Sequence, residues 1–330
     1  MTAPYLEVTD LHVEFRTAGG PVPAVRGLSC AVALGRTLAI VGESGSGKSV
    51  SGLAVMGLHD ARTARVSGSI RVGGREIVGL GEKEMRSYRG RDAAMIFQDP
   101  QSSLHPYFAV GAQIVESYRA HHAVSKRAAK ARAVEMLGRV GIPHPDRRVD
   151  DYPHEFSGGM RQRAMIAMAL VNDPRLLIAD EPTTALDVTV QAQILDLIAD
   201  LQRDFSSAVV VVTHDLGVVA EVADRISVMY AGRVVEHGTA EEVFGAPAHP
   251  YTRGLLDSMP KLIGEDSRLY AIPGLPPSLT NVPPGCPFSP RCPRAVDICR
   301  HDPPPPEVEL WSQRTSACHF AEEVVAHGVR

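Results

Sequence analysis

Hydrophobic and polar residues follow two patterns along this chain, one typical of strands and the other of helices. A period of two, typical of a half-buried strand, covers residues 5–15, and a second strand is expected from residue 25 towards residue 36. Short apolar runs, typical of buried strands, occupy residues 38–41, 91–98, 175–180 and 208–213. Helices are expected over residues 110–118, 126–140, 163–171 and 188–205. Glycine turns mark two hairpins, at residues 66–79 and 226–236.

These elements predict an α/β fold, and their order divides the chain into four parts. Residues 1–101 would form an antiparallel β layer and the first half of a core around a central sheet. Residues 102–162 would form an inserted helical subdomain, because helices replace the alternation of strands and helices there. Residues 163–245 would complete the core, and residues 246–330 would form an extension rich in proline and cysteine.

Composition and charge narrow the class of protein. Hydrophobic residues make up 44% and charged residues 22%, which is ordinary for a soluble globular protein. The net charge of −4 gives no electrostatic reason to expect nucleic-acid binding. No apolar run approaches the roughly 18 residues that span a bilayer. The sequence at the N-terminus lacks the basic-then-apolar order of a secretion signal, so we expect the protein to stay in the cytoplasm.

A glycine-rich stretch lies between the apolar run at residues 38–41 and an expected helix. It reads Gly42-Glu43-Ser44-Gly45-Ser46-Gly47-Lys48-Ser49. Glycines let the backbone curl so that successive N–H groups face phosphate oxygens, aided by the positive end of the following helix. Lys48 can reach the β- and γ-phosphates, and the Ser49 hydroxyl can bind Mg²⁺. The alternative, a flexible turn, is disfavoured because the whole motif matches between a strand and a helix.

The stretch therefore predicts a site for a nucleoside triphosphate with Mg²⁺. The residues expected to bind the nucleotide there are Gly42, Ser44, Gly45, Ser46, Gly47, Lys48, Ser49 and Val50. Phe15, in the first expected strand, could stack on an adenine ring, and packing in the core is an equal alternative from the sequence alone.

Two carboxylates come at the end of the apolar run at residues 175–180. Ligands of open α/β sheets sit at the carboxyl ends of parallel strands. Asp180 is therefore expected to hold Mg²⁺, and Glu181 is expected to act as the general base toward an attacking water. A pair of carboxylates in an ordinary surface turn is the alternative, which the phosphate motif upstream disfavours.

Two further motifs are weaker when taken alone. His214 follows the apolar run at residues 208–213, where it could sense the γ-phosphate or be a satisfied core histidine. Ser157-Gly158-Gly159 could cap a helix and present bare N–H groups to a phosphate, although such a motif is usually only a cap.

Together, these motifs resemble those of the ATPase subunits of ABC transporters over residues 5–251. By this resemblance, residues 42–49 are the Walker A loop and residues 176–181 the Walker B motif. The remaining family motifs match Gln98 (Q-loop), Ser157-Gly158-Gly159 (signature), Asp187 (D-loop, residues 185–187) and His214 (switch histidine). The resemblance implies a P-loop, RecA-like ABC ATPase core with an antiparallel β subdomain and an inserted helical subdomain.

The resemblance also implies roles for these residues. ATP would lie between two subunits, with Ser157, Gly158 and Gly159 of one binding the γ-phosphate at the loop of the other. Catalysis would depend on Glu181, His214 and Gln98, and Asp187 would belong to the nucleotide site. The expected Mg²⁺ ligands are Ser49, Gln98 and Asp180.

Within the family, residues 152–170, 228–238 and 249–256 resemble the oligopeptide/dipeptide importer branch. Met160 stands where the signature usually has glutamine, as in D-type subunits of that branch. The resemblance implies a heterodimer with an F-type ATPase subunit, two membrane permeases, an extracellular substrate-binding protein, and a peripheral location on the cytoplasmic face of the cell membrane. Nickel and glutathione importers share the branch and stay open as alternatives.

Four of the five cysteines lie near the end of the chain, in the spacing C-x5-C-x6-C-x18-C. They are Cys286, Cys292, Cys299 and Cys318. A segment without clear periodicity is unable to build a core alone, so a cross-linking centre is expected to order it. In a reducing compartment four thiolates could hold a [4Fe–4S] cluster, which the resemblance favours, or a structural zinc, and unliganded cysteines are the third alternative.

The sequence therefore predicts an ATP-hydrolysing subunit of an ABC importer for di- and oligopeptides. A soluble ABC ATPase of nucleic-acid metabolism is the rival from another class. Such proteins carry long coiled-coil insertions or two ATPase halves, and neither is present in this sequence. An export ATPase is a third alternative, and exporters are often fused to membrane spans.

Overall fold

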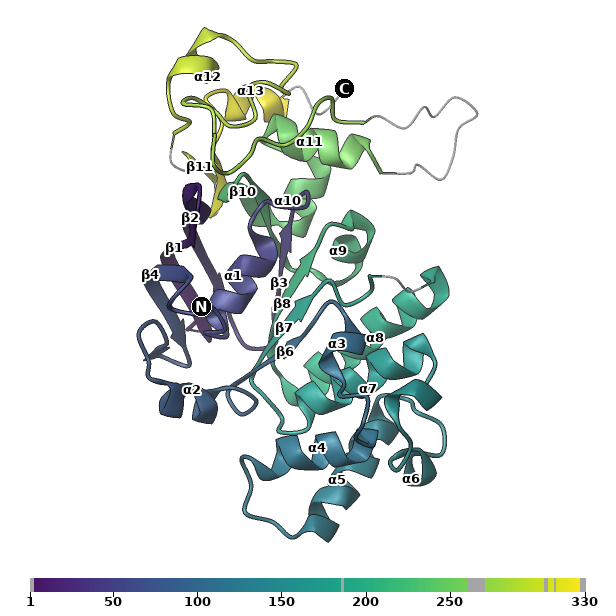
Figure 1. Cartoon of the computed structure of the whole chain (residues 1–330). Coiled ribbons are helices and arrows are strands. Elements are labelled where there is room, and N and C mark those ends of the chain that lie inside the picture. Colours follow the sequence, from purple (N-terminus) through teal and green to yellow (C-terminus); the bar gives the residue numbers. More distant parts are fainter. Residues whose placement is uncertain (1–2, 185–186, 260–270, 306–307, 312, 327–330) are drawn as a thin grey trace. The chain divides into compact units, whose positions relative to one another are not determined.

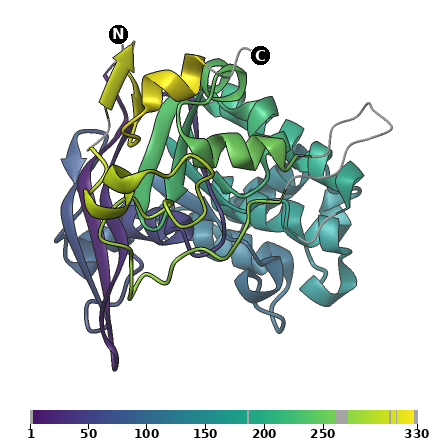
Figure 2. The same cartoon turned by 90° about the horizontal axis from the view of Figure 1, so that it is seen from above.

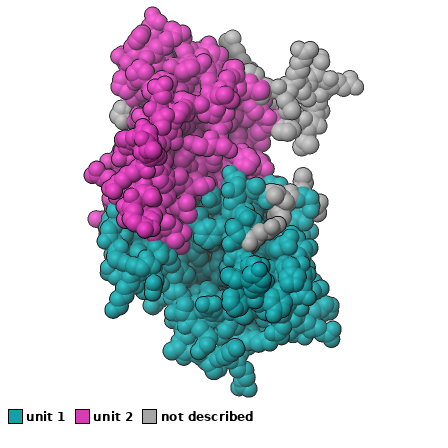
Figure 3. All heavy atoms as spheres, viewed as in Figure 1, with its two compact units in different colours: residues 1–6, 32–36, 72–210 teal, residues 7–31, 37–71, 211–330 magenta. Residues whose placement is uncertain are grey.

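The structure is a computed structural model that describes residues 3–184, 187–259, 271–305, 308–311 and 313–326. The chain forms two compact units, which are described separately (Figure 3). Unit 1 contains residues 1–6, 32–36 and 72–210, and unit 2 contains residues 7–31, 37–71 and 211–330. Two residues of the expected D-loop, 185 and 186, lie outside the described residues. None of the described helices is long and apolar enough to cross a membrane.

Unit 2 contains two layers of strands (Figure 1). In the first, neighbouring strands follow the order β2 (Gly20–Val32), β1 (Leu6–Thr17) and β4 (Ala64–Val72). In the second, the order is β11 (Val308–Trp311), β12 (Arg314–Ser316), β10 (Arg233–Thr239), β9 (Arg225–Tyr230) and β3 (Thr37–Val41). The strand β3 is parallel to β9, whereas β10 is antiparallel to both β9 and β12. All five residues of β3 are buried, as its apolar sequence predicts.

The helices of unit 2 are short. They are α1 (Lys48–Val55), α9 (Leu216–Val222), α10 (Ala240–Gly245), α11 (Pro250–Asp257), α12 (Asp297–His301) and α13 (Ala321–Ala326). The strand β8 (Ala208–Thr213) begins in unit 1 and ends in unit 2, and all of its residues are buried.

Unit 1 contains the parallel pair β6 (Ala93–Ile96) and β7 (Leu176–Asp180) and most of the helices. The register pairs Ala93 with Leu176 and Ile96 with Ala179, so that both strands end at the same edge. The remaining elements are β5 (Arg75–Glu76), α2 (Glu82–Tyr88), α3 (Pro100–Ser103), α4 (Val110–Arg119), α5 (Lys126–Arg139), α6 (Pro145–Arg148), a 3₁₀ helix (Pro153–Glu155), α7 (Gly158–Leu170) and α8 (Val188–Phe205). The helix α5 contacts α4, α6 and α7 (Figure 1).

The predicted α/β class is confirmed, and the expected buried strands form. The helix expected to start at residue 163 begins earlier, at Gly158, because the Ser157 hydroxyl accepts a hydrogen bond from Met160 N at 3.3 Å and caps it. The short helices α9 to α13 have no counterpart in the sequence-based prediction. The expected four-part division of the chain stays a prediction.

The C-terminal residues of unit 2 are ordered by packing on the core of that unit. Tyr230 of β9, Tyr251 of α11 and Phe288 form an aromatic cluster with ring centroids 4.6 to 5.4 Å apart. The strand β12 continues the sheet beside β10, where Arg314 and Glu236, both buried, form an ion pair at 3.1 Å. The elements α11, α12 and α13 lie together at this end of unit 2 (Figures 1 and 2).

His249, at the start of α11, is buried beside this cluster. Its Nδ1 accepts a hydrogen bond from Tyr251 N at 3.1 Å, so the ring caps the helix in its neutral form. Burial lowers the pKa of His249 from 6.5 to about 3. The unfolded chain therefore binds a proton that the folded chain does not bind between these two pH values.

We predict that His249 makes the fold sensitive to acid. The free energy of unfolding should fall as the pH drops below about 6.5, with His249 contributing about 1.4 kcal/mol per pH unit. Urea unfolding of His249→Asn, which keeps a capping acceptor, should show a pH slope that is smaller by this amount between about pH 6 and pH 4. The exposed His301→Asn variant is the matched control. If His249→Asn keeps the slope of the unaltered chain, this explanation of acid sensitivity is wrong.

Candidate nucleotide-binding site

The phosphate loop, residues 42–49, connects β3 to α1 in unit 2 and follows a path that only glycine allows at two positions. Gly42 has φ 151° and Gly47 has φ 101°, both in the region that side chains disfavour. A Cβ at Gly42 would lie 2.2 Å from the Met229 carbonyl oxygen, and one at Gly47 would lie 2.4 Å from that of Ala24. The loop therefore packs between the backbones of β2 and β9.

Two polar side chains inside the loop suit a phosphate group. Lys48 is 5% exposed, and its Nζ donates hydrogen bonds to the carbonyl oxygens of Gly42 at 2.7 Å and Glu43 at 3.0 Å. The Ser46 hydroxyl is buried and has no hydrogen-bond partner among the described residues. Since an unpaired buried hydroxyl is unfavourable, this atom is one that a phosphate oxygen could satisfy. The loop therefore combines a confined cation with an unsatisfied donor.

The other residues expected at the nucleotide in unit 2 lie close to α1 or at the end of β8. Phe15 of β1 is half-buried and contacts His59 edge-on, with ring centroids 5.5 Å apart. His59 Nε2 lies 2.8 Å from the Val50 carbonyl oxygen, so Phe15 is linked through His59 to the start of α1. His214 directly follows β8 and is exposed.

In unit 1, two of the expected catalytic residues meet. Gln98 follows β6 and Glu181 follows β7, and the Gln98 Nε2 donates a hydrogen bond to Glu181 Oε2 at 2.7 Å. The Thr184 hydroxyl donates to the same oxygen at 2.9 Å. Glu181 has φ 45°, a conformation uncommon for a residue with a side chain and more frequent at functional sites. Asp180, the last residue of β7, is 6% exposed.

The structure places the remaining expected residues of unit 1 at helix starts. Ser157 is exposed at the N-cap of α7, and a Cβ added to Gly158 would meet nothing within 4 Å. Gly159 lies closer to its surroundings, since its Cβ would approach Val190 Cγ1 of α8 at 3.2 Å. Asp187 caps α8 by accepting a hydrogen bond from Val190 N at 2.9 Å.

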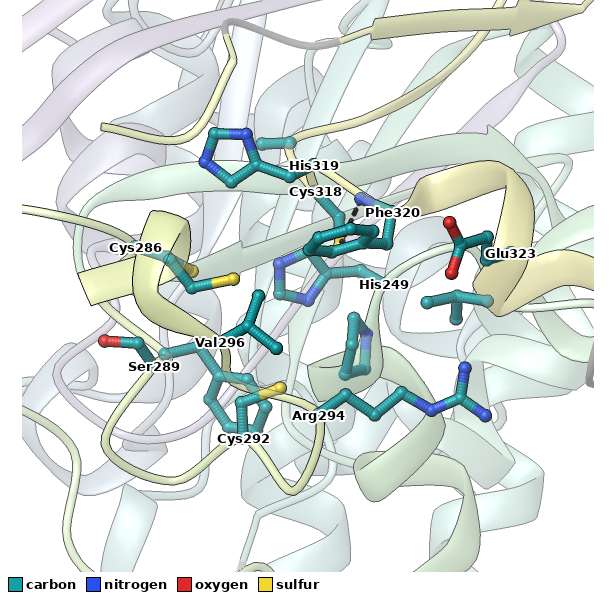
Figure 4. Close-up of a pocket in the computed structure, with 15 residues that line it drawn as sticks. His249, Cys286, Ser289, Cys292, Arg294, Val296, Cys318, His319, Phe320 and Glu323 are labelled. Atoms are coloured by element: carbon teal, nitrogen blue, oxygen red, sulfur yellow. Dashed lines mark hydrogen bonds between the residues drawn. The ribbon is translucent and has the colours of Figure 1, made fainter. Parts of the chain in front are cut away.

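The four C-terminal cysteines line one cavity of about 310 Å³, together with His249, Phe320 and Glu323 among other residues (Figure 4). They form no disulfide. Burial raises the pKa of Cys286 and Cys292 and raises that of Cys318 to about 11, which favours neutral thiols.

The arrangement of Cys286, Cys292, Cys299 and Cys318 contradicts the expected iron–sulfur cluster or zinc. Within the described residues, no group of three or more His, Cys, Asp or Glu is arranged to hold a metal ion. The expectation failed because it assumed that this segment lacks a core of its own and needs a cross-link. In the structure, Phe288 and the buried Arg314 instead attach it to the core and sheet of unit 2.

The sequence-based prediction missed three residues that contact the expected ones, Thr184 in unit 1 and His59 and Tyr251 in unit 2. Thr184 and His59 bear no motif, and only their contacts with Glu181 and Val50 reveal them. The Tyr251 hydroxyl accepts a hydrogen bond from Glu43 N at 2.8 Å across a sequence separation of 208 residues. No local pattern could have indicated that contact.

Comparisons with known proteins agree with this geometry. A family model described as ABC transporter matches residues 25–184, and one described as oligopeptide/dipeptide transporter, C-terminal region, matches residues 235–299. The chain is 53% identical to the oligopeptide transport ATP-binding protein OppD of Salmonella typhimurium, over 95% of this chain and 92% of that protein. It is 50% identical to the dipeptide transport ATP-binding protein DppD of Bacillus subtilis, over 98% of this chain and 97% of that protein.

A solved structure shows the same fold. The ATP-binding cassette MJ0796, in a dimeric post-hydrolysis state bound to ADP and Pi, matches with a TM-score of 0.64 and 25% identity, over 71% of this chain and 98% of that chain. The chain therefore belongs to the ABC transporter family, as one of its ATP-binding proteins that hydrolyse ATP.

Proposed function

We propose that this chain is the ATPase subunit that energises import of di- and oligopeptides. The observation that carries the proposal is the match of residues 235–299 to the C-terminal region of oligopeptide/dipeptide transporters, beside relatives named for transport of those peptides. Nickel and glutathione importers, and ATPases of nucleic-acid metabolism, have no comparable support.

In this proposal the phosphate loop binds the triphosphate of ATP. The loop's backbone N–H groups face the phosphates, except those of Glu43 and Ser46, which donate to the Tyr251 hydroxyl and the Glu43 carbonyl oxygen. The Lys48 ammonium neutralises the phosphate charge, and Phe15 packs against the adenine. Mg²⁺ supplies further charge neutralisation when bound. Ser49, Gln98 and Asp180 carry the oxygen atoms that this hard cation prefers. Gln98 uses its amide nitrogen on Glu181, so its amide oxygen is the atom proposed for the metal.

The proposed general base is Glu181, which takes a proton from the attacking water while His214 contacts the γ-phosphate. The hydrogen bonds from Gln98 and Thr184 fix one carboxylate oxygen of Glu181 and orient the other. A base must lie within hydrogen-bond reach of the proton that it removes, so this orientation is part of its function.

We predict that Glu181→Gln abolishes most hydrolysis but not binding. The turnover number should fall about 10²- to 10⁴-fold because the amide is unable to accept the proton, whereas the dissociation constant for ATP should stay within about threefold. Steady-state ATPase assays and ATP titrations measure the two quantities. Glu135→Gln, at an exposed carboxylate of α5 in the same unit, is the control and should leave both unchanged. Turnover close to that of the unaltered chain would exclude Glu181 as the base.

The proposed assembly contains a second ATPase subunit. Ser157, Gly158 and Gly159 at the start of α7 would bind the γ-phosphate held by the loop of an F-type partner, and the loop of this chain would receive the partner's signature. Two membrane permeases would hold the pair at the cytoplasmic face of the membrane, and an extracellular binding protein would deliver the peptide. The exposure of Ser157 and the open space around Gly158 support a role toward another chain.

We predict that the partner is required for activity and that Ser157 acts on it. ATPase activity should be low for the chain alone and rise on co-expression with the F-type subunit. In the pair, Ser157→Ala should lower activity at least about tenfold, the loss expected for one hydrogen bond to a charged phosphate.

The matched control for this prediction is Ser125→Ala. Ser125 caps α5 as Ser157 caps α7, each hydroxyl accepting from the backbone N–H three residues on, at 3.2 and 3.3 Å. The two variants should therefore lose similar helix stability, and only Ser157→Ala should lose ATPase activity. Equal losses of ATPase activity in the two variants would show that Ser157 only caps the helix. Full activity of the chain alone would exclude the obligate heterodimer.

A further inference from the structure

Arg291, in the C-terminal part of unit 2, forms a partly buried ion pair with Glu43 of the phosphate loop. Its Nη1 lies 2.6 Å from Glu43 Oε2, and its Nη2 lies 2.9 Å from Glu43 Oε1. Two parallel bonds of this kind fix both the distance and the plane of the carboxylate. The Arg291 side chain is 4% exposed and that of Glu43 is 27% exposed, so solvent screens the pair weakly.

The rest of unit 2 holds the Arg291 guanidinium in place. Its Nε donates to the Pro273 carbonyl oxygen at 2.9 Å, and its Nη1 also donates to the Tyr230 hydroxyl at 3.3 Å. The group lies 5.8 Å from the centre of the Tyr230 ring and 6.0 Å from that of Phe288. The hydrogen bonds to Glu43 raise the pKa of Arg291, so the side chain keeps its charge. The guanidinium is therefore oriented by groups outside the loop.

The backbone of Glu43 forms hydrogen bonds, as its side chain does. Its N–H donates to the Tyr251 hydroxyl at 2.8 Å, and its carbonyl oxygen accepts from Lys48 Nζ at 3.0 Å. Glu43 thus connects Lys48 to Tyr251 of α11 and to Arg291. Arg291 lies in residues 271–305, which are called the C-terminal segment here. A shift of Glu43 would move the carbonyl that Lys48 contacts.

We infer that Arg291 is a positioning residue of the phosphate loop, through which the C-terminal segment sets the affinity for ATP. It acts in two ways. It fixes the Glu43 side of the loop, and it neutralises a carboxylate that would otherwise repel a triphosphate bound to the same loop. The inference rests on binding of ATP at residues 42–49, and it assigns the C-terminal segment a role in that binding.

Arg291→Met, Glu43→Gln and the double variant test the inference by titration with Mg·ATP and by KM and kcat in the assembled ATPase pair. Arg291→Met should weaken ATP binding about tenfold and raise KM to match, with kcat at saturating ATP within about twofold. Adding Glu43→Gln to Arg291→Met should restore most of the affinity, because it removes the carboxylate that was left unpaired. A merely structural arginine would change the stability of the fold and leave the affinity of the folded chain for ATP unchanged in all three variants.

Arg300→Met is the matched control, since Arg300 lies in the same segment and pairs with Asp297 at 3.0 Å without reaching the loop. It should leave the affinity for ATP unchanged. Should Arg291→Met fail to fold, Arg291→Lys keeps the charge without the two parallel bonds and should weaken binding to a smaller extent. ATP binding by Arg291→Met equal to that of the unaltered chain, or absence of rescue by Glu43→Gln, would overturn the inference. Absence of ATP binding by the unaltered chain would instead overturn the nucleotide site itself.

Discussion

The nucleotide site depends on how tightly the phosphate loop is confined by its neighbours. Gly42 and Gly47 pass so close to backbone carbonyls of β9 and β2 that any side chain there would collide with them. The Ser46 carbonyl oxygen also accepts a hydrogen bond from Gly232 N at 3.0 Å. A loop whose backbone is fixed in this way loses little conformational freedom when it binds a ligand. The strands around the loop therefore fix its backbone, and by our inference the C-terminal segment that carries Arg291 does so too.

Features with a local cause could be predicted from the sequence. The glycine-rich loop, the buried strand β3 and the carboxylates at the end of β7 each occupy a short stretch whose pattern indicates its structure. The meeting of Gln98 and Glu181 also follows, because parallel strands bring their ends to the same edge. Ser157 was expected to be able to cap a helix, but the helix itself was expected only from residue 163; it begins at Gly158, directly after the cap.

Contacts between residues far apart in the chain could not be predicted from the sequence. Arg291 and Glu43 are separated by 248 residues, and neither belongs to a periodic pattern that would bring them together. The C-terminal cysteines show the opposite error, since their number and spacing suggested a metal centre. The pattern did not reveal that Phe288 packs against both Tyr230 and Tyr251, which attaches the segment to the core of unit 2. The composition of a segment shows which side chains could bind a metal, whereas the packing of the fold determines whether those side chains are arranged to do so.

The central claim is that the loop at residues 42–49 binds the triphosphate of ATP through Lys48. The most direct test is a titration of the purified chain with Mg·ATP beside Lys48→Met, with Lys130→Met, at an exposed lysine of α5, as the control. We expect saturable binding by the unaltered chain and by Lys130→Met, and affinity lower by at least about tenfold for Lys48→Met, since a charged hydrogen bond to phosphate is lost. Equal affinity of Lys48→Met and the unaltered chain would contradict the claim.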